Sequence, residues 1–379
     1  MNPIATDDRL EHLVTELVHA YPFYRKWANE NMKFQDLPII DKSIVNEHRE
    51  SLQLSSEAAL IESFTSGSTG VPFRCVKTPE EKMELSMAIH RHRRKWGLPL
   101  RHESVIIGSS LYANQRMVAQ YASQIANTHP HMIQGRCSAI YRIAEYFAAQ
   151  HVAIPKNLLF IQNWGEIIQP AQKKRIEEIF QVPVLNYYGL EEVWLIAFSN
   201  DAGFLEVDDQ VAHVEVIDPK TSMPVAEGEI GDILVTSFVM KSIPFVRYRT
   251  GDVGRVYVDP VSGKKILDLL PFRANQIKLA DRTVDASIFR YLDQFYHQLS
   301  IEQGVKQFQL IQESFTSFRL LIVANRRNDA GLAMAADQLE LLLRQCLFSE
   351  DVTIAIDCVD EIPPHPVSGK FHPFVCQVS

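Results

Sequence analysis

A run of six small residues at 65–70, TSGSTG, sets the first limit on how this chain can fold. The run has no apolar period, so it cannot bury one face as an amphipathic helix or a strand does. Its two glycines, Gly67 and Gly70, permit backbone angles that are closed to other residues. We therefore predict a loop here. Its hydroxyl groups and unobstructed N–H groups suit anionic oxygens, such as the phosphates of a nucleotide.

The alternative for this loop is a solvent-exposed Ser/Gly turn, which is the commoner role of such a composition. Val71 and Pro72 follow Gly70, so the loop has no Gly-Lys-Ser/Thr ending and is not of the Walker type. Ordinary ATPase or kinase chemistry therefore gains no support from it. From the loop alone, phosphate binding and a plain turn remain equally open.

Composition limits the class of protein. The 379 residues are 46% hydrophobic, which is enough for a large core and for two or three domains. The formal net charge of −8 argues against a nucleic-acid partner, and the five cysteines lack the spacing of a zinc site. The first residues lack the order of a secretion signal, and no apolar run reaches membrane-spanning length. We expect a cytoplasmic protein with reduced thiols and no membrane partner.

Hydrophobic periodicity predicts helices alternating with short strands in the first half of the chain. The expected helices are 8–31, 79–96, 140–150 and 170–180, and the expected strands are 74–77, 104–109, 157–162 and 182–188. This alternation implies a mostly parallel sheet whose ligand site lies at the carboxyl ends of its strands. Asp41 is placed to cap a further short helix.

The helix at 79–96 is expected to be polar on one side and to carry Met83, Met87 and Ile89 on the other. Near its end lies a basic run at 90–95, HRHRRK. We interpret this run as the solvated face of the helix in preference to a binding patch.

Closely spaced β segments replace the alternation from 211 to 256, and turn-forming pairs such as Asp218-Pro219 separate them. They predict a small, mainly antiparallel barrel or subdomain at about 204–270. The remaining chain is typical of a separate α+β domain, with helices at 285–299 and 330–347 and strands at 307–314, 318–325 and 352–359. The predicted fold class is therefore α/β. A large N-terminal domain at 1–272 has mixed, mostly parallel sheets, and a small C-terminal α+β domain at 273–379 carries Lys370.

Three further stretches carry groups suited to chemistry. Glu191 and Glu192 follow a β-prone run, and only one of them can face inward because adjacent side chains point apart. Asp252 follows a glycine and suits a vicinal diol such as ribose, whereas Lys370 lies in an extended, proline-rich tail. The alternatives are acids favourable to a helix dipole, a solvated Gly-Asp turn and a solubilising charge.

Taken in this order, the four stretches resemble the core motifs of the adenylate-forming superfamily of acyl-CoA synthetases, condensation adenylation domains and luciferases. The motifs are TSGSTG at 65–70, YGLEE at 188–192, RTGD at 249–252 and SGK at 368–370. The stretches 21–27, 37–43, 164–166 and 214–252 are similar to the branch of phenylacetate-CoA ligases and CapK-type proteins. The resemblance covers nearly the whole chain.

The resemblance implies that ATP activates a carboxylic acid as an acyl-adenylate, with release of pyrophosphate. Lys370 would bridge the substrate carboxylate and the α-phosphate, and Glu192 would bind Mg²⁺, so that Lys370, Glu192 and Thr69 are the expected catalytic residues. The other implied nucleotide-binding residues are Thr65, Ser66, Gly67, Ser68 and Gly70 for the phosphates, Tyr187, Tyr188 and Gly189 near the adenine or the acyl pocket, Asp252 for the ribose, and Arg273 for ribose or phosphate.

The resemblance further implies CoA as the acyl acceptor, and Trp164, Gly165 and Tyr187 would line a pocket for an aryl or hydrophobic acid. A carrier-protein thiol, an amine, or a non-catalytic nucleotide-binding role are the alternatives, and a homodimer is one candidate oligomeric state. The chain departs from the family pattern at Phe272 and Asn275, near the interdomain hinge, and at Glu191, where a small hydroxyl residue is usual. The hinge departures bear on acyl transfer, which in this family requires rotation of the tail domain.

Overall fold

The computed structural model describes residues 6–27, 32–54, 59–65, 73–108, 115–166, 168, 170–273, 277–278, 305–324, 337–341, 343–345, 352–363, 371–372 and 374–378. The chain forms two units. Unit 1 comprises Met1–Arg94, Tyr188–Gly251 and Arg255–Asp268, and unit 2 comprises Lys95–Tyr187, Asp252–Gly254 and Leu269–Ser379. The predicted division at 272/273 stays a prediction.

Unit 1 begins with two helices, α1 (Thr6–Ala20) and α2 (Pro22–Arg25), where a single helix was expected. The backbone at Tyr21 is extended, with φ −114° and ψ 119°. The cause is Pro22, whose ring disfavours the helical conformation of the residue before it. Tyr21 is buried, and its hydroxyl donates a hydrogen bond to the carbonyl of Lys241 at 2.6 Å, so the break is held by tertiary contacts.

The next elements of unit 1 are the 3-10 helix η1 (Phe34–Asp36) and the helices α3 (Lys42–Glu47) and α4 (Arg49–Leu52). Asp41 caps α3 as predicted, because its carboxylate accepts a hydrogen bond from the N–H of Ile44 at 2.9 Å. Strands β1 (Ile61–Thr65) and β2 (Phe73–Lys77) then pair antiparallel, with Thr65 opposite Phe73. The strand predicted at 74–77 is confirmed as part of β2. The TSGSTG motif therefore starts at the end of β1, while its residues from 66 onward lie outside the described residues.

Helix α5 (Pro79–Lys95) follows the predicted bounds to within one residue. Its buried side differs from the prediction, because Met83 and Met87 are 60% and 59% exposed, whereas Leu85 is buried. Glu81 also faces inward, where its carboxylate accepts hydrogen bonds from the N–H groups of Lys241 and Ser242 at 2.5 and 2.6 Å. A polar contact thus helps to set which side of this helix is buried.

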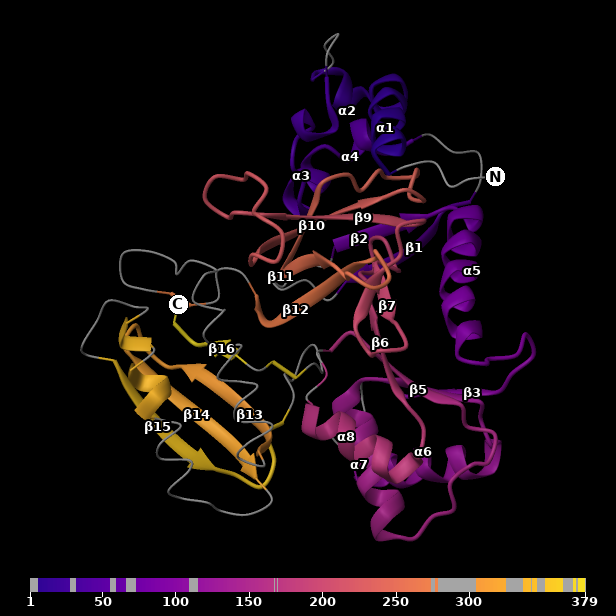
Figure 1. Cartoon of the computed structure of the whole chain (residues 1–379), viewed down its shortest axis with the longest axis vertical. Coiled ribbons are helices and arrows are strands. Elements are labelled where there is room, and N and C mark those ends of the chain that lie inside the picture. Colours follow the sequence, from indigo (N-terminus) through magenta and orange to yellow (C-terminus); the bar gives the residue numbers. More distant parts are fainter. Residues whose placement is uncertain are drawn as a thin grey trace. The chain divides into compact units, whose positions relative to one another are not determined.

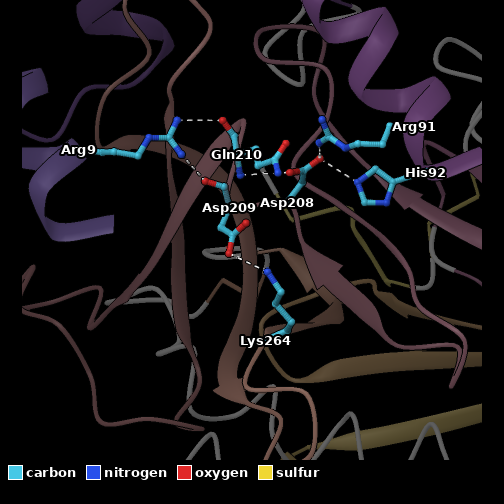
Figure 2. Close-up of polar contacts among 7 residues, drawn as sticks. All are labelled: Arg9, Arg91, His92, Asp208, Asp209, Gln210 and Lys264. Carbon is cyan, nitrogen blue, oxygen red and sulfur yellow. Dashed lines mark hydrogen bonds and ion pairs between the residues drawn. The ribbon is translucent and has the colours of Figure 1, made fainter. Parts of the chain in front are cut away.

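The basic run at the end of α5 is only partly a solvated face. Figure 2 shows that His92 and Arg91 both reach the buried carboxylate of Asp208, with His92 Nε2 at 2.8 Å from Oδ2. The His92 ring also stacks on Phe198 at a centroid distance of 5.1 Å. Arg9 of α1 donates to the carbonyl of Asp209 at 2.7 Å, so the segment Asp208-Asp209 links α1 and α5. The prediction was wrong for His92, which is buried by these partners.

Substitution of Asp208 by asparagine is expected to lower the free energy of unfolding at pH 7 by about 2 kcal/mol, because hydrogen bonds to charged groups are lost. Burial opposes ionisation of Asp208, but the hydrogen bond from His92 and the charge of Arg91 outweigh it, so the pKa of Asp208 is lowered from its usual value. This stabilisation is therefore complete above about pH 4 and is lost as the pH falls through the folded-state pKa.

Urea unfolding of the wild type and Asp208→Asn between pH 7 and pH 2 measures the effect. The difference between the two proteins should shrink at the acid end. A difference that stays constant over this range would contradict the role assigned to the ionised Asp208 carboxylate.

The rest of unit 1 is mainly antiparallel. Its strands are β7 (Ala197–Ser199), β8 (Leu205–Val207), β9 (Ala212–Ile217), β10 (Gly231–Ser237), β11 (Tyr248–Val258) and β12 (Lys265–Arg273), the last two running into unit 2. Their order is β7-β8-β12-β11-β10-β9, and β7/β8, β8/β12 and β9/β10 are antiparallel. A Cβ at Gly231 would lie 2.3 Å from the carbonyl oxygen of Ile217, so only glycine lets β10 start this close to β9. The antiparallel strands predicted from 211 onward are confirmed.

Unit 2 contains a parallel set of strands in the order β3 (Ser104–Ile106), β4 (Met132–Gly135), β5 (Phe160–Trp164) and β6 (Val184–Tyr188). Figure 1 shows the helices α6 (Gln115–Thr128), α7 (Cys137–Ala149) and α8 (Pro170–Phe180), in magenta, gathered beside these strands. Their shared core includes Val105, Ile133 and Ile161 from the strands and Ile140 and Ile143 from α7. The predicted parallel arrangement is confirmed here, whereas no prediction covered α6 and β4.

A small mixed sheet forms the C-terminal part of unit 2, with the order β15-β14-β13-β16. The strands are β13 (Val305–Gln312), β14 (Ser317–Ala324), β15 (Thr353–Cys358) and β16 (Phe374–Cys376). The β13/β14 pair is antiparallel, and the β14/β15 and β13/β16 pairs are parallel. Residues 337–341 and 343–345 are helical, within the helix predicted at 330–347. The helix predicted at 285–299 lies outside the described residues.

The cysteines of the described residues, Cys75, Cys137, Cys358 and Cys376, are not paired in disulfides. Cys346 lies outside those residues. In the same described ranges, no helix combines the length and the apolar character needed to cross a bilayer.

Candidate functional site

A buried carboxylate, Glu192, has partners from two separate stretches of unit 1. The residue is 2% exposed, and it lies in the loop that follows β6. Its Oε1 accepts a hydrogen bond from the hydroxyl of Tyr248, on β11, at 2.9 Å. The same oxygen pairs with the ammonium of Lys42, the first residue of α3, at 3.1 Å. The second predicted motif is therefore held by the N-terminal helices and by the antiparallel strands.

Lys42 also reaches the first predicted motif. Its Nζ lies 3.4 Å from Oγ1 of Thr65, the residue that ends β1 and begins the TSGSTG run. The Lys42 side chain is 42% exposed, so a cation stands at the solvent boundary between a hydroxyl of one motif and the carboxylate of the other. Lys42 was not a predicted site residue. Its only sequence signal is its place in the LPIIDKS stretch, beside the helix cap Asp41.

Glu191 holds the same two stretches together from the other side. Its Oε1 accepts a hydrogen bond from the hydroxyl of Ser63, on β1, at 2.6 Å. Lys77, on β2, donates to the backbone carbonyl of Glu191, and its ammonium lies 5.4 Å from the centroid of the Trp194 ring. Glu191 is half-buried whereas Glu192 is buried, as expected if only one of two adjacent acids faces inward. The unusual acid at 191 therefore has a structural task, which is to tie the β1/β2 hairpin to the loop.

The environment of Glu192 sets the protonation of its neighbours. Burial and the negative charge of Glu192 raise the pKa of Tyr248 far above its usual range, so Tyr248 remains a hydrogen-bond donor. The same two causes raise the pKa of Cys75 to about 12. Because the thiolate is the nucleophilic form of cysteine, Cys75 is excluded as a nucleophile at neutral pH. Burial lowers the pKa of Lys77, while the nearby acids Glu191 and Glu192 counteract part of that shift.

A magnesium ion fits this site only if Glu192 shares its coordination with oxygen atoms that do not come from the protein. Within the described ranges, no group of three His, Cys, Asp or Glu side chains could enclose a metal. Glu192 uses Oε1 for its contacts with Lys42 and Tyr248. Mg²⁺ is commonly held by one or two carboxylates together with phosphate and water oxygens. One buried carboxylate such as that of Glu192 matches that mode of binding.

The predicted pocket residues of unit 2 lie together at the carboxyl ends of two parallel strands. Trp164 on β5 stands opposite Tyr187 on β6 in the strand register, and Gly165 follows with a φ of +69°. Beneath them the side chains of Asn163 and Asn186 join the two strands through a hydrogen bond of 3.0 Å. The ends of parallel strands are the usual place for a ligand in such sheets.

The structure places the other predicted residues less completely. Tyr188 ends β6 in a buried position, and its carbonyl accepts a hydrogen bond from the N–H of Ile196 at 3.0 Å. Gly189 follows it. Asp252 is half-buried on β11, directly after Gly251, which has a φ of +79°. Arg273 ends β12, but its side chain, the residues 66–70 and Lys370 lie outside what the structure describes. The roles of all these residues stay predictions.

Comparisons with known proteins point in one direction. Residues 288–376 match the family described as CapK C-terminal domain. A phenylacetate-coenzyme A ligase of Thermus thermophilus is 24% identical over an alignment of 292 positions that covers 65% of this chain and 64% of that protein. The phenylacetate-coenzyme A ligase of Escherichia coli is 28% identical over 138 residues, covering 35% and 29% of the two chains. Protein CapK of Staphylococcus aureus is 24% identical over 144 residues, covering 38% and 30%. The matched regions span less than two-thirds of each relative.

Solved structures show the same fold. A 2-hydroxyisobutyryl-CoA ligase in complex with 2-HIB-AMP aligns with a TM-score of 0.71 at 15% identity, covering 93% of this chain and 85% of that one. The amide bond synthetase McbA from Marinactinospora thermotolerans aligns with a TM-score of 0.58 at 17% identity, covering 82% and 67%. Together with the CapK and phenylacetate-coenzyme A ligase relatives, these matches confirm that the chain resembles the adenylate-forming superfamily, in the branch of phenylacetate-CoA ligases and CapK proteins.

Proposed function

We propose that this protein uses ATP to convert a carboxylic acid into an acyl-adenylate with release of pyrophosphate, and then transfers the acyl group to CoA. The observation that carries the proposal is the position of Lys42, whose ammonium contacts Thr65 of the first motif and Glu192 of the second. Two motifs far apart in the sequence thus share one cation. The aromatic side chains of Trp164 and Tyr187 favour an aryl or hydrophobic acid.

The reaction requires positive charge because both reactants are anions. A carboxylate oxygen of the acid attacks the α-phosphorus of ATP and forms a new C–O–P linkage, while the bond to the oxygen that bridges to the β-phosphate breaks and pyrophosphate leaves. Fixed cations in a water-poor site favour the transition state of such a step. Lys42 supplies one such charge, and the buried carboxylate of Glu192 keeps its ammonium in place. Mg²⁺ bound at Glu192 would neutralise further phosphate charge.

The remaining roles follow from the motifs and are part of the proposal. Ser66, Gly67, Ser68, Thr69 and Gly70 would extend the anion site that begins at Thr65. Tyr188 and Gly189 would border the adenine, Asp252 would accept the ribose hydroxyls, and Arg273 would contact ribose or phosphate. Lys370 would bridge the acid carboxylate and the α-phosphate. Tyr248 adds a positioning role, because its hydrogen bond orients the Glu192 carboxylate toward Lys42.

The direct test is acid-dependent release of pyrophosphate. Purified protein is incubated with ATP, Mg²⁺ and a panel of aryl and short aliphatic acids, and both pyrophosphate and AMP are measured. We expect release with at least one acid and none without acid. Release of ADP or free phosphate in place of pyrophosphate would contradict the proposal, as would calorimetric ATP binding without turnover on any acid of a broad panel.

The acyl acceptor is tested separately. After adenylate has formed, CoA is added and the thioester is measured by mass spectrometry. Thioester formation is the expected result. If the adenylate persists with CoA but is consumed by an amine or by a carrier-protein thiol, CoA is not the acceptor and that second compound takes its place in the proposal. The first half-reaction would still stand.

A further inference from the structure

Glu166 occupies an unusual position beyond the end of β5. Gly165, with a φ of +69°, adopts a backbone conformation that favours glycine. The Glu166 carboxylate lies at the start of α7. Its Oε2 accepts hydrogen bonds from the N–H of Ser138 at 3.0 Å and from the Ser138 hydroxyl at 2.6 Å. The N-cap residue of α7, Arg136, makes no side-chain capping bond, so Glu166 caps this helix from another element.

The backbone around Glu166 is fixed as well. The fully buried Asn163 donates from Nδ2 to the carbonyl of Glu166 at 2.6 Å, and its Oδ1 accepts the N–H of Cys137 at 2.8 Å. One amide side chain therefore joins the loop after β5 to the first turn of α7. This network fixes the backbone from which the Glu166 carboxylate extends.

The second oxygen of Glu166 has a different partner. Oε1 accepts a hydrogen bond from the N–H of Phe371 at 2.9 Å, and Phe371 is buried. The residues that follow are held on the small C-terminal sheet. Gln309 of β13 donates to the carbonyl of His372 at 2.8 Å, and β16 pairs with β13. Glu166 thus joins the loop after β5 to the C-terminal sheet.

Other contacts within unit 2 support this connection. The guanidinium of Arg142, on α7, lies 3.3 Å from the carboxylate of Glu361, which follows β15. Helix α8 lies against β13. Burial raises the pKa of Glu166, and the hydrogen bonds from Ser138 and Phe371 together with the charge of Arg136 offset part of that rise. The donors facing both oxygens are N–H and O–H groups, which suit an ionised carboxylate.

Phe371 directly follows Lys370 in the sequence. We infer that Glu166 is a positioning residue, which holds the backbone at Phe371, the sequence neighbour of the proposed catalytic Lys370, for adenylate formation. This inference rests on the proposed function. A helix cap alone would need only Oε2, whereas the bond from Phe371 to Oε1 contributes nothing to capping.

The contact itself is tested by amide hydrogen exchange. In Glu166→Gln the amide group presents only one acceptor oxygen, so an N–H donor is left facing the Nε2 group. We expect the exchange of the Phe371 amide to accelerate at least about tenfold in this variant, the effect of losing a hydrogen bond to a charged group. Ser138→Ala is the matched control, because it weakens the bonds to α7 and leaves the Phe371 N–H in place. Equal acceleration in the two variants, or none in Glu166→Gln, would refute the contact.

The consequence for catalysis is tested with the two half-reactions and a double variant. Glu166→Gln should reduce acid-dependent pyrophosphate release about tenfold and leave the conversion of a supplied acyl-adenylate to the thioester unchanged. In a Lys370→Ala background, the same substitution should cause no further loss of adenylation, because the residue to be positioned is absent.

Multiplication of the two losses in the double variant would show that Glu166 acts only through stability and would overturn the positioning role. An equal loss of adenylation in Ser138→Ala would do the same. If the wild type releases no pyrophosphate with any acid, the proposed function fails together with the catalytic part of this inference. Hydrogen exchange at Phe371 still decides the contact in that case.

Discussion

Replacement of Lys42 by methionine is expected to lower kcat/KM for acid-dependent pyrophosphate release about 100-fold, because a preorganised charge beside the reacting phosphate is removed. The substitution also leaves the buried carboxylate of Glu192 with Tyr248 as its remaining described partner. Initial rates at varied ATP and acid concentrations measure the effect. Lys42→Arg should retain part of the activity, since the positive charge is kept while its shape changes.

Lys241→Met is the matched control for this prediction. Lys241 is an exposed lysine of the same unit, and its ammonium pairs with Glu16 at 3.0 Å, away from Glu192. Its removal should change the rate less than about twofold, because exposed ion pairs contribute little. Wild-type kinetics in Lys42→Met would contradict the site, as would a loss of activity matched by an equal loss in Lys241→Met.

Replacement of Lys370 by alanine is expected to suppress adenylate formation by about 100-fold or more while sparing acyl transfer. The ammonium is needed where a carboxylate and a phosphate, both negative, come together. In the second step a thiol displaces AMP from an acyl group that is already activated, so this charge is no longer required there. The two steps are measured separately, as pyrophosphate release from acid and ATP, and as thioester formation from a supplied acyl-adenylate.

Lys278→Ala is the control for the second prediction. Lys278 belongs to unit 2, and its ammonium donates to the carbonyl of Val378 at 3.0 Å, near the end of the chain. This variant should keep both half-reactions. A similar loss of both half-reactions in Lys370→Ala would contradict the division of labour and would point to a general disturbance of the C-terminal domain.

Local features of the fold follow directly from the sequence. Asp41 caps α3 and Pro22 separates α1 from α2, because capping and the proline ring act over a few residues. At Pro22 the sequence contained the signal for a helix break, although the prediction joined the two helices. Helix α6 shows the same, since its buried residues Val118, Ala122 and Ile125 recur at helical spacing. These differences are errors of interpretation and do not reflect missing information.

Other features depend on contacts that no local pattern contains. His92 is buried because Asp208, far along the chain, supplies a carboxylate for it. Lys42 and Tyr248 both contact Glu192 because three stretches that are distant in the sequence pack together. The spacing of these residues in the sequence does not predict the contact. The motifs predict which residues carry the chemistry. The side chains that hold those residues in place emerge only from the structure, as Glu166 illustrates.

The pairing of Lys42 with Glu192 also restricts how this protein can be shortened. Helices α1 to α4 precede the β1/β2 hairpin and could be mistaken for a dispensable leader. A version that starts at β1 would keep the hydroxyl-rich loop and Glu192. It would lack Lys42, however, and would leave the buried negative charge of Glu192 without its paired cation. Any shortened version of the protein, and any chimera that exchanges the first fifty or so residues, must therefore carry a lysine at the start of α3.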